Sequence, residues 1–293
     1  MRARLAIAVA AWSAPAGALA HGTAAPLLPG WSFEPWALVP IALAAALFAI
    51  GQTRLSRRSS GGRRSLVRRS ILFWLGLAVL AGAVVSPLHA AGARSFTAHM
   101  VEHELIMLAA APLLVWAAPL PIMLWAFPAA CRRRLGGLAR AIAASPPWRA
   151  VTAPAAATAL QATALWVWHL PGPFDLALGS EGWHAVQHLC FFGTALAFWS
   201  AMVGPRRDPW TAAACLFATS LITGALGALM AVSPSPWYAA YARLGLAAFG
   251  LTPAQDQQLA GVVMWAPGGL VHAAAALAIL APRLRSASGA ADA

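Results

Sequence analysis

Two histidine pairs in this sequence have the spacing of a helical metal site. His99 and His103 are four residues apart, and so are His184 and His188. Residues at i and i+4 lie on one face of a helix, so each pair places two imidazoles side by side. His169 precedes the second pair by a short loop. The pattern predicts one metal site that gathers these five histidines.

Carboxylates and thioethers flank the histidines along the chain. They are Glu102, Glu104, Asp175, Glu181 and Asp256, with Met100, Met107 and Met264. Imidazole with carboxylate suits zinc, iron or copper, and an added thioether favours copper(I). We therefore add Asp256 and Met264 to the predicted metal-binding residues. The three cysteines show no CxxC spacing, so neither a thiolate site nor a disulfide framework is indicated.

Structural roles account for similar residues without any metal. Methionines in apolar helices usually fill the core, which makes Met100 and Met107 supporting candidates only. Asp256 can equally be stabilised by a helix N-terminus. His89 and His272 are interpreted as structural histidines.

The elements that must position these groups are membrane helices. The chain has 293 residues, is 60% hydrophobic and 10% charged, and has a mean hydropathy of +0.69; soluble domains carry about 25% charged residues. Apolar segments, each near the ~20 residues that cross a bilayer, occupy Trp36–Gly51, Ser70–Leu88, Ala98–Phe127, Ala150–His169, His184–Val203, Trp210–Met230 and Gln258–Ala281. We predict an all-α polytopic bundle of about seven transmembrane helices, the third kinked or shortened by Pro112, Pro119 and Pro121.

Arginine placement predicts the orientation of the bundle. All twenty basic residues are arginine, and the formal net charge is +12. Sixteen lie in the loops after the first, third and fifth segments and in the C-terminal tail, whereas the opposite loops hold only Arg94 and Arg243. The positive-inside rule then places the N-terminus outside and the C-terminus in the cytoplasm. The same placement argues against nucleic-acid binding, and it puts every histidine except His272 near the outer face.

The N-terminus has the pattern of a secretory signal. Arg2 and Arg4 precede an apolar stretch and the small-residue cleavage site Ala18–Ala20. We expect a signal peptide at 1–20, one transmembrane domain at 21–282 and a short cytoplasmic tail at 283–293. Cleavage would leave His21 as a terminal amine and imidazole for copper; without cleavage the segment is an extra span.

Several short motifs together resemble the seven-helix CtaG family of cytochrome c oxidase assembly factors. They cover roughly residues 36 to 282 and comprise Ala98-His99-Met100-Val101-Glu102-His103 with Pro112, Trp168-His169-Leu170-Pro171 with Phe174-Asp175, His184-Ala185-Val186-Gln187-His188, Trp199, Pro236-Trp237-Tyr238, and Asp256-Gln257-Gln258-Leu259-Ala260-Gly261 with Met264-Trp265. Departures are Phe174, where the family often has Tyr, and Glu102, where it often has Gln. The family's motif histidines map to His99, His103, His169, His184 and His188.

The resemblance implies a non-enzymatic assembly factor in a bacterial plasma (inner) membrane. Its partners would be cytochrome c oxidase subunits, a copper ion and the lipid bilayer. Two alternatives stay open: a bis-histidine haem protein using His103 and His188, and a metal-free scaffold for oxidase assembly. A transporter is disfavoured because few ionisable residues lie in the inner half of the bilayer. We find no nucleophile motif that would indicate an enzyme.

Overall fold

The computed structural model describes residues 30–58, 62–204, 208–244 and 250–291, and every regular element in these ranges is a helix. The predicted all-α polytopic fold is therefore confirmed. The predicted signal peptide at 1–20 and His21 lie outside the described residues.

Six helices in the described part of the chain are long and apolar enough to cross a membrane. They are α1 (Pro35–Ser56), α2 (Arg63–Val84) extended by α3 (Pro87–Gly92), the continuous run of α4 (Phe96–Glu104), η1 (Leu105–Ala110) and α5 (Ala111–Ala117), α11 (Glu181–Val203), α12 (Pro209–Val232) and α14 (Pro253–Ala291). Their length and composition make this a multi-pass membrane protein. The orientation of its ends remains a prediction.

The predicted fourth span is a shorter helix than the others. It is helical over α9 (Pro154–Trp168), which has 15 residues and follows the short α8 (Pro146–Val151). At 1.5 Å per residue α9 is roughly 22 Å long, less than the ~30 Å hydrocarbon core of a bilayer. It packs against α11 and α12. A total of seven spans therefore remains a prediction.

Short helices complete the chain. They are α6 (Leu120–Met123), η2 (Leu124–Ala126), α7 (Ala129–Ala144), α10 (Pro171–Gly179) and α13 (Ala239–Ala242). The segment predicted as a tail from residue 283 continues α14 as far as Ala291.

Proline shapes the third span as the sequence predicts. Pro112 has no N–H, and its ring crowds the carbonyl of the residue four before it. The backbone widens there into the π-helix η1. Trp199 Nε1 donates to the carbonyl oxygen of Met107 at 2.9 Å, inside this segment. The helix ends at Ala117, short of the end of the apolar segment at Phe127, and there the Arg69 guanidinium donates to the carbonyls of Ala117 and Ala118.

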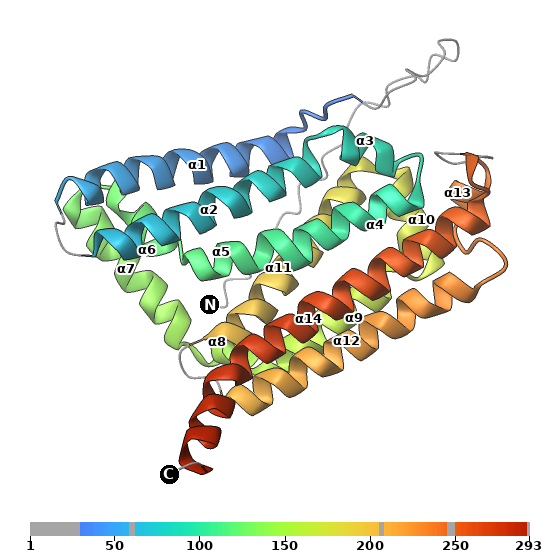
Figure 1. Ribbon diagram of the computed structural model, residues 1–293. Coiled ribbons are helices and arrows are strands. Elements are labelled where there is room, and N and C mark those ends of the chain that lie inside the picture. Colours follow the sequence, from blue (N-terminus) through green and yellow to red (C-terminus); the bar gives the residue numbers. More distant parts are fainter. Residues whose placement is uncertain (1–29, 59–61, 205–207, 245–249, 292–293) are drawn as a thin grey trace, which may run out of the picture.

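The long helices form two groups joined by α11 (Figure 1). α1, α2 and α5 pack together, and α12 pairs closely with α14. α11 contacts α5 from the first group and α9 and α12 from the second, while α4 packs on α14. Because α12 also packs on α14, these contacts fix α4 and α11 relative to each other.

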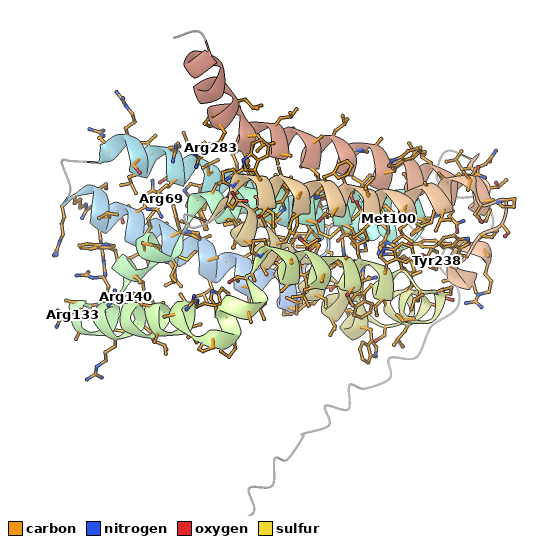
Figure 2. All side chains as sticks on the ribbon, turned by 90° about the horizontal axis from the view of Figure 1, so that it is seen from below. Arg69, Met100, Arg133, Arg140, Tyr238 and Arg283 are labelled. Atoms are coloured by element: carbon orange, nitrogen blue, oxygen red, sulfur yellow. The ribbon has the colours of Figure 1, made fainter. Side chains whose placement is uncertain are left out.

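Arginine gathers at one end of the bundle. Figure 2 shows Arg69, Arg133 and Arg140 at that end and Tyr238 at the other. The guanidiniums of Arg58 and Arg132 lie 5.9 and 3.9 Å from the ring centroid of Trp125 at the arginine end. The predicted concentration of arginine away from the histidine-bearing end is thus present in the structure.

A glycine pair sets the distance between α12 and α14. A Cβ on Gly227 would lie 2.7 Å from the carbonyl oxygen of Gly261, and one on Gly261 would meet the carbonyl of Gly227 even more closely. Small residues that let two backbones approach are a common feature of membrane helix pairs.

We expect Gly227→Ala to destabilise the protein by about 1–3 kcal/mol, because the added methyl must push the two helices apart. Thermal unfolding in detergent measures the effect. Gly193→Ala on α11 is the matched control, since nothing lies within 4 Å of its added Cβ. Equal melting temperatures for the two variants would show that the close approach is unimportant.

Candidate metal centre

Six histidines from four parts of the bundle converge near the end opposite the arginines. α3 contributes one, α4 two, α11 two, and the residue after α9 one: His89, His99, His103, His184, His188 and His169. We call them the histidine cluster. All are buried except the half-buried His184. The five predicted histidines therefore lie together, and His89, interpreted from the sequence as structural, joins them.

The rings form a continuous ladder. The centroids of His89 and His184 are 5.1 Å apart, and those of His184 and His99 are 5.2 Å apart. His103 follows His99 at 4.3 Å, and His169 lies 6.3 Å beyond His103. Because α4 and α11 face each other, the two i, i+4 pairs become one cluster.

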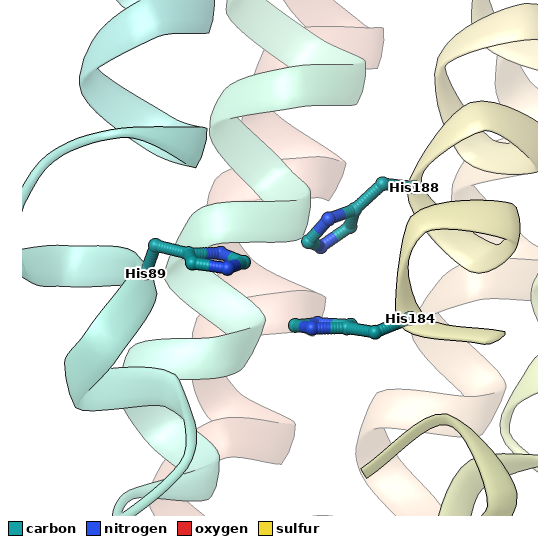
Figure 3. Close-up of side chains that lie close together, drawn as sticks. All are labelled: His89, His184 and His188. Carbon is teal, nitrogen blue, oxygen red and sulfur yellow. The ribbon is translucent and has the colours of Figure 1, made fainter. Parts of the chain in front are cut away.

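Three of these imidazoles point toward one another from α3 and α11 (Figure 3). One ring nitrogen of each of His89, His184 and His188 lies within 4.8 Å of the other two. Bonds from a metal ion to imidazole nitrogen are about 2.0–2.1 Å long. The separation is therefore close to that of ligands around a single ion.

Most ring nitrogens in the cluster have no hydrogen-bond partner. Both nitrogens of His99, His103 and His188 are buried without one, as is Nε2 of His184. Leaving a buried polar atom unsatisfied costs roughly 1–3 kcal/mol. A bound ion would satisfy one lone pair on each neutral imidazole, so the donor set fits a transition metal.

A buried carboxylate orients one of the histidines and lies close to a second. The Glu102 side chain is fully buried, and its Oε1 accepts a hydrogen bond from Nδ1 of His89 at 2.7 Å. The same oxygen lies 3.4 Å from Nε2 of His188. With its proton on Nδ1, His89 presents an Nε2 lone pair, the arrangement by which carboxylates orient metal-binding histidines.

The deep end of the ladder carries a thioether. His169 Nδ1 donates to the carbonyl of Leu165 at 2.7 Å, which leaves Nε2 as a lone pair. That Nε2 lies 3.4 Å from Sδ of Met100. The two atoms share no proton, so they form a pair of converging donors of the kind that suits copper(I).

Met100, rather than Met264, supplies the thioether that contacts the cluster. Both methionines are buried in the main hydrophobic core, but the contact with a cluster histidine, His169, is that of Met100. The sequence marks Met100 only by its place next to His99 on a helix, a signal it shares with ordinary core methionines.

Asp256 holds the start of α4. Its carboxylate accepts hydrogen bonds from the Ser95 hydroxyl at 3.0 Å, from the Phe96 N–H at 2.6 Å, and from the N–H and hydroxyl of Thr97 at 3.2 and 2.6 Å. The Asp256 carboxylate thereby satisfies N–H groups that would otherwise be free at the N-terminus of α4. The structure thus gives Asp256 a capping role, on α4 rather than on its own helix.

Other side chains at the histidine-bearing end support the cluster indirectly. Gln257 accepts from the Trp237 N–H at 2.7 Å and donates to the Ser235 carbonyl at 3.1 Å. The Tyr238 hydroxyl donates to the His169 carbonyl at 2.9 Å, and that of Tyr241 to the Gly92 carbonyl at 2.5 Å. Burial raises the pKa of both phenols, so they stay protonated donors at neutral pH.

Glu34, which precedes α1, also lies beside the cluster, and no sequence pattern indicates it. Its Oε1 lies 3.8 Å from Nε2 of His89, and its other oxygen accepts from Trp36. Glu34 and His89 are 55 positions apart, and no periodic pattern links them. Only the packing of α1 beside α2 and α3 brings them together.

A family model described as "Cytochrome c oxidase caa3 assembly factor" matches residues 46–286 of this chain. The whole histidine cluster lies within the matched residues. No curated protein and no solved structure is found to match the chain.

The variant Asp256→Asn distinguishes a helix-capping role of Asp256 from a role as a metal ligand. We expect Asp256→Asn to lower stability by about 1–2 kcal/mol, because a charge and an acceptor are lost at a helix N-terminus. Thermal unfolding and metal analysis of the folded fraction check this. Unchanged metal content is the expected result; a stable variant that has lost its metal would identify Asp256 as a ligand.

Proposed function

This chain belongs to the cytochrome c oxidase caa3 assembly factor family, and we propose that it serves oxidase assembly by binding copper at the histidine cluster and aiding its delivery. The role is non-enzymatic: the protein holds and transfers an ion without making or breaking covalent bonds. Its setting is the bacterial plasma membrane, with the cluster on the outer side.

One observation carries the proposal. Six side chains of the same chemistry converge in a membrane-embedded bundle, and seven of their ring nitrogens are buried without a hydrogen-bond partner. Packing alone would favour apolar residues at such positions, because hydrocarbon offers polar atoms no partners. Coordination of an ion would explain the residue type, and it would satisfy one of the ring nitrogens on each histidine that binds it.

The donor set favours copper among the common metals. The cluster offers six imidazoles and one thioether, that of Met100, which contacts His169. Imidazole suits copper, zinc, iron and nickel, and thioether favours copper(I). The three cysteines are free, and none of them belongs to the cluster. An oxidase of the haem–copper class is also a protein that needs copper.

Haem is a poorer fit to the same site. A bis-histidine haem must place its ring between two axial imidazoles, for which His103 and His188 are the candidates. The His103 ring packs edge-to-face against Phe191 at 4.7 Å and against His99 at 4.3 Å. Rings therefore already fill the space beside this pair.

Delivery follows from the position of the cluster. The histidines lie opposite the arginine-rich end, so the positive-inside rule puts them on the outer side. An oxidase subunit that receives copper on that side could take the ion from the cluster while docked beside the helices. Neutral imidazole is a suitable carrier because protonation competes with the metal and keeps binding reversible.

We expect purified wild-type protein to hold near-stoichiometric copper without a Soret band, and the double variant His103→Ala, His188→Ala to lose it. Metal analysis and an optical spectrum in detergent measure this. Oxidase activity in cells that depend on each variant should fall in parallel. His272→Ala is the matched control: it removes a buried imidazole whose ring contacts are with Phe198 and Trp199.

Two outcomes would contradict the copper site. Full copper content in the double variant would place the metal elsewhere. A wild-type protein free of both copper and haem, with oxidase assembly intact, would identify the chain as a metal-free scaffold whose histidines serve structure.

A further inference from the structure

A cavity of about 310 Å³ leads from the surface to the histidine cluster. The segment before α1, the helix α3, the end of α10 and the start of α11 line it. Its polar lining consists of Ser32, Glu34, His89, Glu181 and His184, and the rest is small or apolar. We call this cavity the vestibule.

The mouth of the vestibule is acidic. The Glu34 side chain is 23% exposed, and Glu181 is exposed at the start of α11. The two carboxyl groups lie close enough to interact directly. No arginine is among the described residues that line this cavity. Two neighbouring carboxylates in a concave site attract cations and raise their local concentration.

The floor of the vestibule consists of metal-binding atoms. The His89 side chain is 8% exposed, and its Nε2 lies 3.8 Å from Glu34 Oε1, beyond hydrogen-bond distance. Nδ1 of His89 is hydrogen-bonded to Glu102, so the other ring nitrogen, Nε2, is the one that faces Glu34. Nε2 of His184 is buried without a hydrogen-bond partner. The imidazole nitrogens therefore lie next to the carboxylates, on the inner side of the vestibule.

A second opening reaches the cluster from the side of the bundle, and its chemistry is different. It is a groove of about 100 Å³ between α1, α2 and α11 that touches His188. Its other lining residues are apolar, among them Trp36, Ile41, Leu80 and Phe192. A bare or hydrated cation would lose its solvation there without compensation. Of the two routes, the vestibule is the one that suits an ion.

We propose that the vestibule is the aqueous inlet of the copper site, in which Glu34 and Glu181 capture the cation and pass it to His89 and His184. The inference rests on the proposed copper-binding function and adds the route. From the inlet the ladder runs through His99 and His103 to His169. Donors thus change from carboxylate to imidazole and finally to imidazole with thioether.

The test compares the rate of loading with the final copper content. Cu(I) is supplied as its acetonitrile complex to metal-free protein in detergent. Excess chelator stops the loading at set times, and the copper bound to the protein is then measured. The variant Glu34→Gln, Glu181→Gln should load at least about tenfold more slowly, with a weaker dependence on ionic strength. Its final copper content should equal that of wild type.

Two further variants sharpen the comparison. Asp175→Asn is the matched control, because it removes a negative charge from α10 outside the vestibule lining; it should load at the wild-type rate. Ala93→Phe narrows the vestibule at an exposed position without changing charge. This variant should load copper more slowly than wild type and reach a similar final copper content.

Each failure has a distinct meaning. A wild-type protein that takes up no copper would overturn the proposed function and the inlet with it. Wild-type loading rates in the Glu34→Gln, Glu181→Gln variant would overturn the inlet and leave the copper site standing. Reduced final content at an unchanged rate would make the two carboxylates ligands rather than an inlet.

Discussion

The structure depends above all on the cost of an unsatisfied polar group inside a bundle surrounded by hydrocarbon. In the third span, backbone carbonyls that the α-helical pattern leaves free have side-chain partners. The Met107 carbonyl, in the π-helical segment that Pro112 imposes, accepts from Trp199, and the carbonyls at the end of α5 accept from Arg69. Side chains of the same helix differ from these carbonyls: both ring nitrogens of His99 and His103, and one carboxylate oxygen each of Glu102 and Glu104, are buried without a hydrogen-bond partner. The proposed coordination of an ion gives the unpaired imidazoles a role that packing alone does not.

Polar contacts at the histidine-bearing end of the bundle hold α3, α4 and the turn after α9, which together carry four of the six cluster histidines. Asp256, from the start of α14, binds the N-terminus of α4 through both carboxylate oxygens. Tyr238 and Tyr241 tie the turn after α9 and the end of α3 to the short α13. None of these side chains needs to touch the ion. Their role is to limit the positions that the ligands can adopt, which is how a surrounding shell of hydrogen bonds pre-organises a metal site.

The sequence predicts the helical fold, the shortened third span and the gathering of His99, His103, His169, His184 and His188, because periodicity and hydropathy are local properties that a single sequence displays. Contacts between distant segments are not local, and these are what the prediction lacked. His89 has no second histidine at helical spacing in the sequence. Only the turn from α2 into α3 brings its side chain to Glu102. For Asp256 the residue type correctly indicates a helix N-terminus, but the helix concerned begins 160 positions earlier, at Phe96.

The most direct test of the central claim is the X-ray absorption spectrum of copper-loaded protein at the copper edge, because it reports the ligands rather than the amount of metal. The account predicts nitrogen scatterers with the outer-shell pattern of imidazole from at least two histidines, with or without one sulfur from Met100. A first shell of sulfur alone, or of oxygen and nitrogen without the imidazole pattern, would contradict it and place the copper outside the histidine cluster.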